Sequence, residues 1–344
     1  MFSPQSHRLP RLCLLAALVM GPTVLLGGGQ TQPAAAPAPP KIVRLAPADA
    51  ARLAADERQK VSVEMPPGLE VKVFAPEGLV ADPIAIDLDE HGTLYVASSS
   101  RASLPLDIRG HPTWVPIAHT LRTHEDLQKF YQRELAPDRS ATNTWIDDLN
   151  KDGSHDFRDL SELKERLVRI QDTDGDGIAD VSQVMAEGFN ADPTFDVVGG
   201  LLYLRGELFF GIAPGIWRMR DANGDGIIDT QTPVSQGYNI HPAFGGHGIS
   251  GITLGPDGRI YWEVGDIGFS IVDGKGRRMS YPNQGGVFRA DPDGSNVEVF
   301  AAGIRNLQEF AFDELGNLIS VDNDGDHEGE TERLVYLPEG SDSG

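Results

Sequence analysis

The sequence predicts an all-β fold of the β-propeller type, and two recurring patterns predict it. The first is a short hairpin with a glycine at its turn and an apolar or alternating run after it, which occurs at Gly92, Gly206, Gly258 and Gly316. The second is a strand, an acidic turn and another strand, found at residues 167–189, 216–238 and 287–304. Together they make four-stranded units, which are typical of propeller blades. A stack of unrelated hairpins is the alternative.

The spacing of the hairpins predicts an insertion inside the first unit. The turn glycines are 114, 52 and 58 residues apart, so the first gap is about twice the others. We assign the extra length to residues 101–159, which break the strand pattern and should lie over one face of the β structure. Within this insertion, Thr123 to Leu135 is predicted to be a helix, because a threonine can cap its start and apolar residues recur at helical spacing.

The strand count gives three whole units and a fourth that stops after its third strand, all within residues 66–344. A propeller ring needs closure to remove its exposed strand edges. We therefore expect an incomplete ring of about four blades, from the N-terminal part of a longer protein.

The first 36 residues are predicted to be a signal peptide. Arg8 and Arg11 precede an apolar run at residues 12–27, and small residues follow at 34–36. An uncleaved membrane anchor is the alternative, although the apolar run is short for a span of about 20 residues. Residues 37–65 are interpreted as an Ala/Pro-rich tether and lead-in. We expect a secreted or periplasmic protein, with membrane association as the alternative.

Charge and cysteine content exclude several function classes. A net charge of -22 argues against nucleic acid and anionic membranes as partners. The single cysteine, Cys13, lies in the predicted signal, so the mature chain has no disulfide, no thiol chemistry and no C-x-x-C-H haem attachment. The many carboxylates either keep the protein soluble or hold cations.

Three acidic loops have the spacing of calcium-binding loops. The first loop offers Asp148, Asn150, Asp152, Asp156 and Asp159. The second offers Asp172, Asp174, Asp176 and Asp180, and the third Asp221, Asn223, Asp225 and Asp229. Solvated Asp/Gly turns are the alternative, but several carboxylates in one tight turn repel each other unless a cation is present. We predict structural Ca²⁺ ions at these loops.

His247 is the candidate catalytic residue, because it lies in a glycine-rich approach to the strand at residues 249–254. Arg305 and Asn306 stand at the matching entrance to the next blade, so these side chains would converge on one propeller face. A neutral imidazole beside a fixed guanidinium suits proton abstraction from an alcohol. The alternatives are a structural histidine at a strand end and an arginine that bridges two blades.

The same stretches carry a resemblance to a known family. His247 with GPDGRIYWEVGD, then GIRNLQEFAFDELGNL and DNDGDHEGETERL, resemble the soluble quinoprotein glucose and sorbosone dehydrogenases. The opening PPGLEVKVFAPEGLVADPIAIDLDEHGTLYVASS and the acidic blade loops resemble more closely the N-terminal domain of membrane-bound dehydrogenases of planctomycete-type bacteria. The resemblance extends over residues 66–344.

The resemblance implies a six-bladed propeller that holds pyrroloquinoline quinone and Ca²⁺ and oxidises a sugar or an alcohol. His247 would then take the proton of the substrate hydroxyl during hydride transfer, and Arg305 and Asn306 would contact the quinone. A cytochrome c, often fused downstream in such proteins, would be the electron acceptor. The alternative function is a calcium-stabilised propeller that binds a carbohydrate or a protein partner without catalysis.

Overall fold

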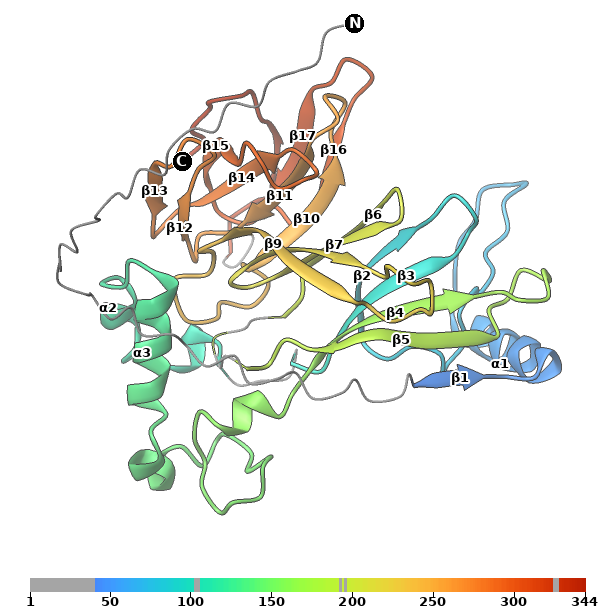
Figure 1. The fold of residues 1–344 in the computed structure, drawn as a ribbon, viewed down its shortest axis with the longest axis horizontal. Helices are drawn as coiled ribbons and strands as arrows, with labels where there is room; N and C mark the ends of the chain where they lie inside the picture. Colours follow the sequence, from blue (N-terminus) through green and yellow to red (C-terminus); the bar gives the residue numbers. More distant parts are fainter. Residues whose placement is uncertain (1–40, 102–105, 192–193, 195–196, 324–327) are drawn as a thin grey trace, which may run out of the picture. The chain divides into compact units, whose positions relative to one another are not determined.

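The computed structural model describes residues 41–101, 106–191, 194, 197–323 and 328–344, and most of their regular secondary structure is antiparallel sheet (Figure 1). The predicted signal peptide at residues 1–36, and the tether up to residue 40, lie outside the described residues. In the described part of the chain, no helix has the length and apolar character that a membrane crossing needs.

The first sheet has the strand order β1-β5-β4-β3-β2. Its strands are β1 (Ile42–Arg44), β2 (Pro83–Leu88), β3 (Leu94–Ser99), β4 (Glu165–Gln171) and β5 (Val181–Gly188). β1 adds to the outer edge of the sheet, where Ile42 is paired with Gln183. The helix α1 (Pro47–Lys60) follows β1, with a proline in its first turn. The sequence pattern did not predict these two elements of the lead-in.

Three further sheets follow in chain order. The second is β6 (Gly200–Leu204), β7 (Glu207–Ile212), β8 (Gly215–Arg220) and β9 (Thr230–Gln236). The third is β10 (Ile249–Leu254), β11 (Ile260–Val264), β14 (Gly285–Ala290) and β15 (Glu298–Ile304). The fourth is β16 (Phe310–Phe312), β17 (Leu318–Asp322) and β18 (Arg333–Tyr336). A separate hairpin, β12 (Phe269–Val272) with β13 (Arg278–Tyr281), is inserted between β11 and β14 and was not predicted.

The hairpin glycines lie where the sequence predicts them, each between two strands that are adjacent in a sheet. All four adopt left-handed backbone, with φ of 81° at Gly92, 85° at Gly206, 80° at Gly258 and 83° at Gly316. The first strands of these hairpins contact one another, β2 with β6, β6 with β10 and β10 with β16. The second and third sheets have the four strands of a propeller blade, and the predicted all-β, β-propeller fold is confirmed.

Aromatic rings pack the second and third blades together. The ring of Phe288 lies edge-on to Tyr238 and Phe269, with centroid distances of 4.9 and 4.7 Å. Trp262 and Phe209 are fully buried in the same cluster, so strands β7, β11 and β14 share one core.

The segment between β3 and β4 contains the helices of the insertion. These are η1 (Ile108–Gly110), α2 (Val115–Ala118), α3 (His124–Glu134), η2 (Pro137–Thr142) and η3 (Asp159–Ser161). The predicted helix is confirmed, because Thr123 caps α3 in a capping box with Asp126. The insertion also contacts the loop before β10, since the Tyr131 hydroxyl accepts a hydrogen bond from the Ala243 N–H at 3.1 Å. It therefore positions the loop that leads to His247.

Candidate active site and acidic loops

His247 is held in a pair with an aspartate at the other end of its hairpin. Its side chain is 5% exposed, and its Nδ1 lies 2.7 Å from Oδ1 of Asp266. β10 and β11 are antiparallel, and Ile249 faces Val264, so the residue two positions before β10 meets the residue two positions after β11. Because a carboxylate only accepts, Nδ1 donates, and neutral His247 carries its lone pair on Nε2. Asp266 was not among the predicted site residues, although the antiparallel register of the predicted hairpin places it near His247.

Arg305 reaches the same place through its backbone. Its carbonyl accepts a hydrogen bond from the Asp266 N–H at 2.8 Å. Gly265 lies in a close crossing, because a Cβ there would be 2.8 Å from the carbonyl oxygens of both Arg305 and His247. The structure therefore brings the predicted base and the predicted cofactor-binding segment to one point.

The side chains of the cofactor-binding pair have partners within their own blade. Arg305 Nη1 donates to the carbonyl and to Oδ1 of Asn323, at 2.7 and 2.9 Å. Asn306 is buried, and its Oδ1 accepts from Gln308 Nε2 at 2.8 Å. These contacts fix a guanidinium and an amide beside the loop that carries Gly246, whose carbonyl accepts a hydrogen bond from Gln308.

The ring of Phe244 lies close to the histidine and to two arginines. Its centroid is 4.1 Å from the ring of His247, 5.8 Å from the Arg305 Cζ and 4.8 Å from the Arg109 Cζ. Arg109 comes from the insertion and was not among the predicted site residues. Each guanidinium can interact with the ring face, so Phe244 links the insertion to the loop of the candidate base.

Asp107 connects the insertion to this site through a hydrogen bond to the glycine-rich loop. Its carboxylate accepts from Arg109 at 2.7 and 2.9 Å and from the Gly245 N–H at 2.9 Å. The hydrogen bonds from Arg109 lower the pKa of Asp107 to about 2. The carboxylate therefore stays ionised over the physiological pH range and holds the glycine-rich loop in place.

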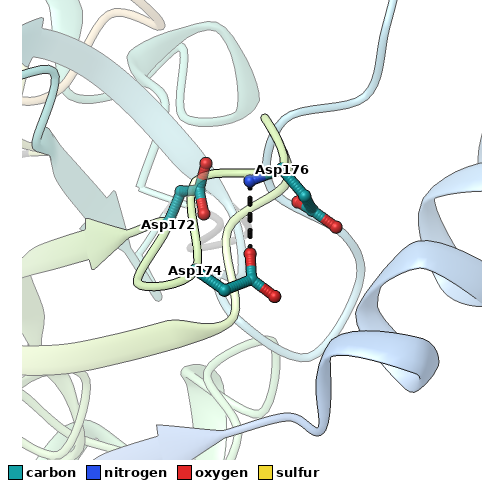
Figure 2. A group of neighbouring side chains, drawn as sticks. All are labelled: Asp172, Asp174 and Asp176. Carbon is teal, nitrogen blue, oxygen red and sulfur yellow. Dashed lines mark hydrogen bonds between the residues drawn. The ribbon is translucent and has the colours of Figure 1, made fainter.

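The loop between β4 and β5 contains a group of three carboxylates that lie close to one another (Figure 2). In the described part of the chain, Asp172, Asp174 and Asp176 are the one group of His, Cys, Asp or Glu whose ligand atoms all lie within 4.8 Å of one another. Asp172 accepts hydrogen bonds from the Gly175 and Gly177 N–H groups at 2.7 and 2.8 Å. These bonds, the one from Gly177 first, lower the pKa of Asp172.

Asp180, the fourth predicted ligand of this loop, faces a different partner. Its carboxylate accepts from the N–H and the hydroxyl of Thr173, at 2.9 and 2.6 Å. The loop between β8 and β9 repeats the arrangement. Asp221 accepts from Gly224 and Gly226, and Asp229 accepts from Ala222 and Asn223. The equivalent Asp225 accepts from the Ile227 N–H at 2.8 Å.

The first predicted calcium loop contains a cation of its own. The Arg158 guanidinium lies 2.9 Å from Asp152 Oδ2 and 2.6 Å from Asp156 Oδ2, and it lowers the pKa of Asp156 to about 2. The other two carboxylates accept hydrogen bonds from N–H groups of the loop. Asp148 accepts from Asp152 and Gly153. Asp159 accepts from Leu149 and Asn150. Arginine therefore neutralises two of the predicted ligands, an arrangement that the residue spacing alone does not reveal.

No curated protein matches this sequence. Among solved structures, the chain is similar to a pyrroloquinoline quinone-bound aldose sugar dehydrogenase from Streptomyces coelicolor, with 15% identity, 76% of this chain and 62% of that chain covered, and a TM-score of 0.39. A gluconolactonase-like protein is 18% identical over 52% of this chain and 59% of that chain, with a TM-score of 0.31. The quinone-binding domain of a pyranose dehydrogenase from Coprinopsis cinerea is 15% identical over 40% and 47%, with a TM-score of 0.20.

In each case the chain covers less than two thirds of the matched structure. These similarities are distant in sequence and in structure, and none of them assigns an activity to this chain. One protein family matches most of the sequence. Residues 55–337 match the family described as Domain of unknown function (DUF7133), and the chain belongs to that family.

Proposed function

We propose that this protein is a secreted or periplasmic dehydrogenase that oxidises a hydroxyl group of a sugar or an alcohol, with pyrroloquinoline quinone as its cofactor and a cytochrome c as electron acceptor. The observation that carries the proposal is the His247–Asp266 pair at 2.7 Å, beside Phe244 and Arg305. A base, its orienting carboxylate and a nearby cation are the parts that proton abstraction from an alcohol requires.

Asp266 and His247 would divide the proton chemistry between them. Asp266 accepts from Nδ1, which sets the tautomer and leaves Nε2 free to take the hydroxyl proton of a substrate. The imidazolium formed in that step would remain next to the Asp266 carboxylate, which stabilises its charge. The burial of His247 keeps bulk water away from the ring.

The residues around Phe244 fit the proposed cofactor. Pyrroloquinoline quinone is flat and carries carboxylates, and when bound it supplies a hydride acceptor. Arg305 and Arg109 place two guanidinium groups within 5.8 Å of one aromatic ring, and guanidinium groups suit planar anions. Arg305 and the Asn306 amide would hold the cofactor, with Arg109 as a further cation.

The first test separates binding from proton transfer. Titration with pyrroloquinoline quinone and Ca²⁺ should change the absorbance spectrum, and Arg305→Ala should weaken that binding. His247→Ala should leave quinone binding nearly intact but lower turnover of the substrate by about 10²-fold or more, the scale of losing a general base. Turnover is measured with a dye acceptor and a panel of aldoses and primary alcohols.

The exposed histidine variant His91→Ala is the matched control, and it should behave as the wild type does. Asp266→Asn should lower turnover as well, because the amide can hold the wrong tautomer of His247. If no spectral change occurs with the wild type, the proposal fails and the non-catalytic propeller that binds a carbohydrate or protein partner becomes the better one.

We also propose that Ca²⁺ binds the acidic blade loops, above all the loop with Asp172, Asp174 and Asp176. Removal of Ca²⁺ with a chelator should then lower the melting temperature, because the ion stabilises the folded state by about 2.7 kcal/mol when its concentration is 100 times Kd. Asp174→Asn should reduce the calcium-dependent rise in melting temperature, whereas Asp138→Asn, on the exposed η2 helix, should not. If neither the chelator nor Ca²⁺ changes the melting temperature, these loops are ordinary turns.

A further inference from the structure

A cavity of about 210 Å³ lies between the insertion and the loop before β10. Its apolar lining includes Val115 and Ala118 of α2, Pro242 of the loop, and Ile267 after β11. Phe244 and Asp266 also line it, but His247 does not. The cavity therefore adjoins the candidate active site through two shared residues without containing its base.

His241 lines this cavity and has an unsatisfied polar atom. The residue is 9% exposed, and within the described residues its Nε2 is buried without a hydrogen-bond partner. Buried polar atoms in folded proteins nearly always have a partner, because leaving one unpaired destabilises the fold. Burial also lowers the pKa of His241 to about 4, so the ring is neutral at physiological pH.

The other polar groups of the lining decide what kind of molecule the cavity can take. Asp266 contributes a carboxylate that His247 holds in place at 2.7 Å. His119 lies across from His241, with the two rings 5.9 Å apart, and its Nδ1 faces Asn283 Oδ1 at 3.4 Å. An amide oxygen accepts only from a protonated Nδ1, which leaves Nε2 of neutral His119 as an acceptor. Hydrogen-bond acceptors therefore predominate among the polar groups that line the cavity.

The charges of the lining and the volume of the cavity further limit the kind of ligand that it can bind. An anion would meet the Asp266 carboxylate, which repels it, and a neutral His241. A cation would have to give up its hydration against apolar walls. The volume exceeds the about 150 Å³ of apolar cavities that hold a benzene molecule. A neutral molecule with hydroxyl donors and some hydrocarbon surface matches each of these properties.

We propose that this cavity is a binding site for a small neutral hydroxylated molecule, of the size of a diol or a short polyol, which hydrogen-bonds to Nε2 of His241. The site adjoins the proposed dehydrogenase site through Phe244 and Asp266, but it needs no quinone and no contact with His247. One of its walls comes from the insertion, so the insertion would act as part of a ligand pocket.

Propylene glycol is a suitable probe, and the ¹⁵N resonance of His241 Nε2 in the full chain is the readout. Addition of propylene glycol should shift this resonance in a saturable way and leave the resonances of His91 unchanged. Acetate and ethylamine, an anion and a cation of similar size, should give no such shift. An unmoved His241 resonance with propylene glycol, or an equal response to acetate, would overturn the proposal.

Variants test the contact itself through saturation transfer from the protein to the methyl protons of propylene glycol. His241→Phe keeps a ring but removes the nitrogen, and binding should weaken about tenfold. Ala118→Leu should abolish binding by filling the cavity, and His91→Phe should not affect it. Because the wild-type resonance is measured independently, the proposal stays testable even where a variant does not fold. Equal binding by His241→Phe and the wild type would refute it.

Discussion

Replacement of Arg101 by methionine is expected to lower the free energy of unfolding by about 3–5 kcal/mol, the usual effect of removing one partner from a buried ion pair. The side chains of Arg101 and Glu165 are 2% and 0% exposed, and Arg101 Nε lies 3.7 Å from Glu165 Oε1. Methionine fills a similar volume but leaves the carboxylate buried without its cation. The decrease in stability therefore comes from the buried charge of Glu165 rather than from a cavity.

The pair also joins the ends of three strands. Arg101 Nη2 donates to the carbonyls of Leu163 and Phe189 at 3.2 and 3.1 Å, and Glu165 Oε1 accepts from the Ser99 hydroxyl at 2.8 Å. Ser99 ends β3, Glu165 begins β4 and Phe189 follows β5. The guanidinium thus holds the first blade together at the point where the insertion leaves it.

Urea denaturation of the full chain measures this effect, and Arg166→Met is the matched control. Arg166 is 34% exposed and pairs with Glu187 on the surface, so its replacement should change the free energy of unfolding by no more than about 1 kcal/mol. In the Arg101→Met background, Glu165→Gln should restore part of the loss, because it removes the buried charge. Equal losses for Arg101→Met and Arg166→Met would contradict the expectation.

Stability is also expected to decrease as the pH rises from about 4.5 to about 8, because of Glu263 on β11. Burial is the main cause that raises the pKa of this carboxyl from 4.5 to about 8, and the charges of Asp322 and Glu309 add to it. The Ser250 hydroxyl donates to Oε1, whereas Oε2 is buried without a partner in the described part of the chain. Glu263 is therefore protonated in the folded protein at neutral pH.

The direction of the effect follows from proton binding. In this pH window the folded chain holds the Glu263 proton and the unfolded chain has released it, so each rise in pH favours unfolding. The contribution is fully present below pH 4.5 and is lost as the pH rises to the folded-state pKa. One proton changes the free energy of unfolding by at most about 1.4 kcal/mol per pH unit.

Glu263→Gln should remove this slope, because an amide of the same shape stays neutral at every pH. Its free energy of unfolding should therefore exceed that of the wild type by a margin that grows toward pH 8. Glu90→Gln, at an exposed position in the hairpin of the first blade, is the control and should keep the wild-type pH dependence. Urea denaturation at a series of pH values is the measurement. A Glu263→Gln curve parallel to that of the wild type would rule out a titrating Glu263.

The features that the sequence alone determined are those that depend on a few neighbouring residues. A tight turn needs left-handed backbone, which glycine adopts without strain, and Gly92, Gly206, Gly258 and Gly316 accordingly mark the first hairpin of every blade. The start of α3 was predictable because Thr123 caps it through a residue three positions away. Repetition of such local signals was enough to predict a propeller.

Only the tertiary structure decided which distant side chains meet. Asp266 is paired with His247 because antiparallel strands bring the two ends of one hairpin together, and Phe244 faces Arg109 because the insertion packs against the loop before β10. Arg158 lies among the carboxylates of its own loop, although the residue spacing there is that of a calcium loop. The cavity at His241 has the same origin, since its walls come from segments that are far apart in the chain. Such contacts depend on packing between elements, which the spacing of residues along one strand or turn does not encode.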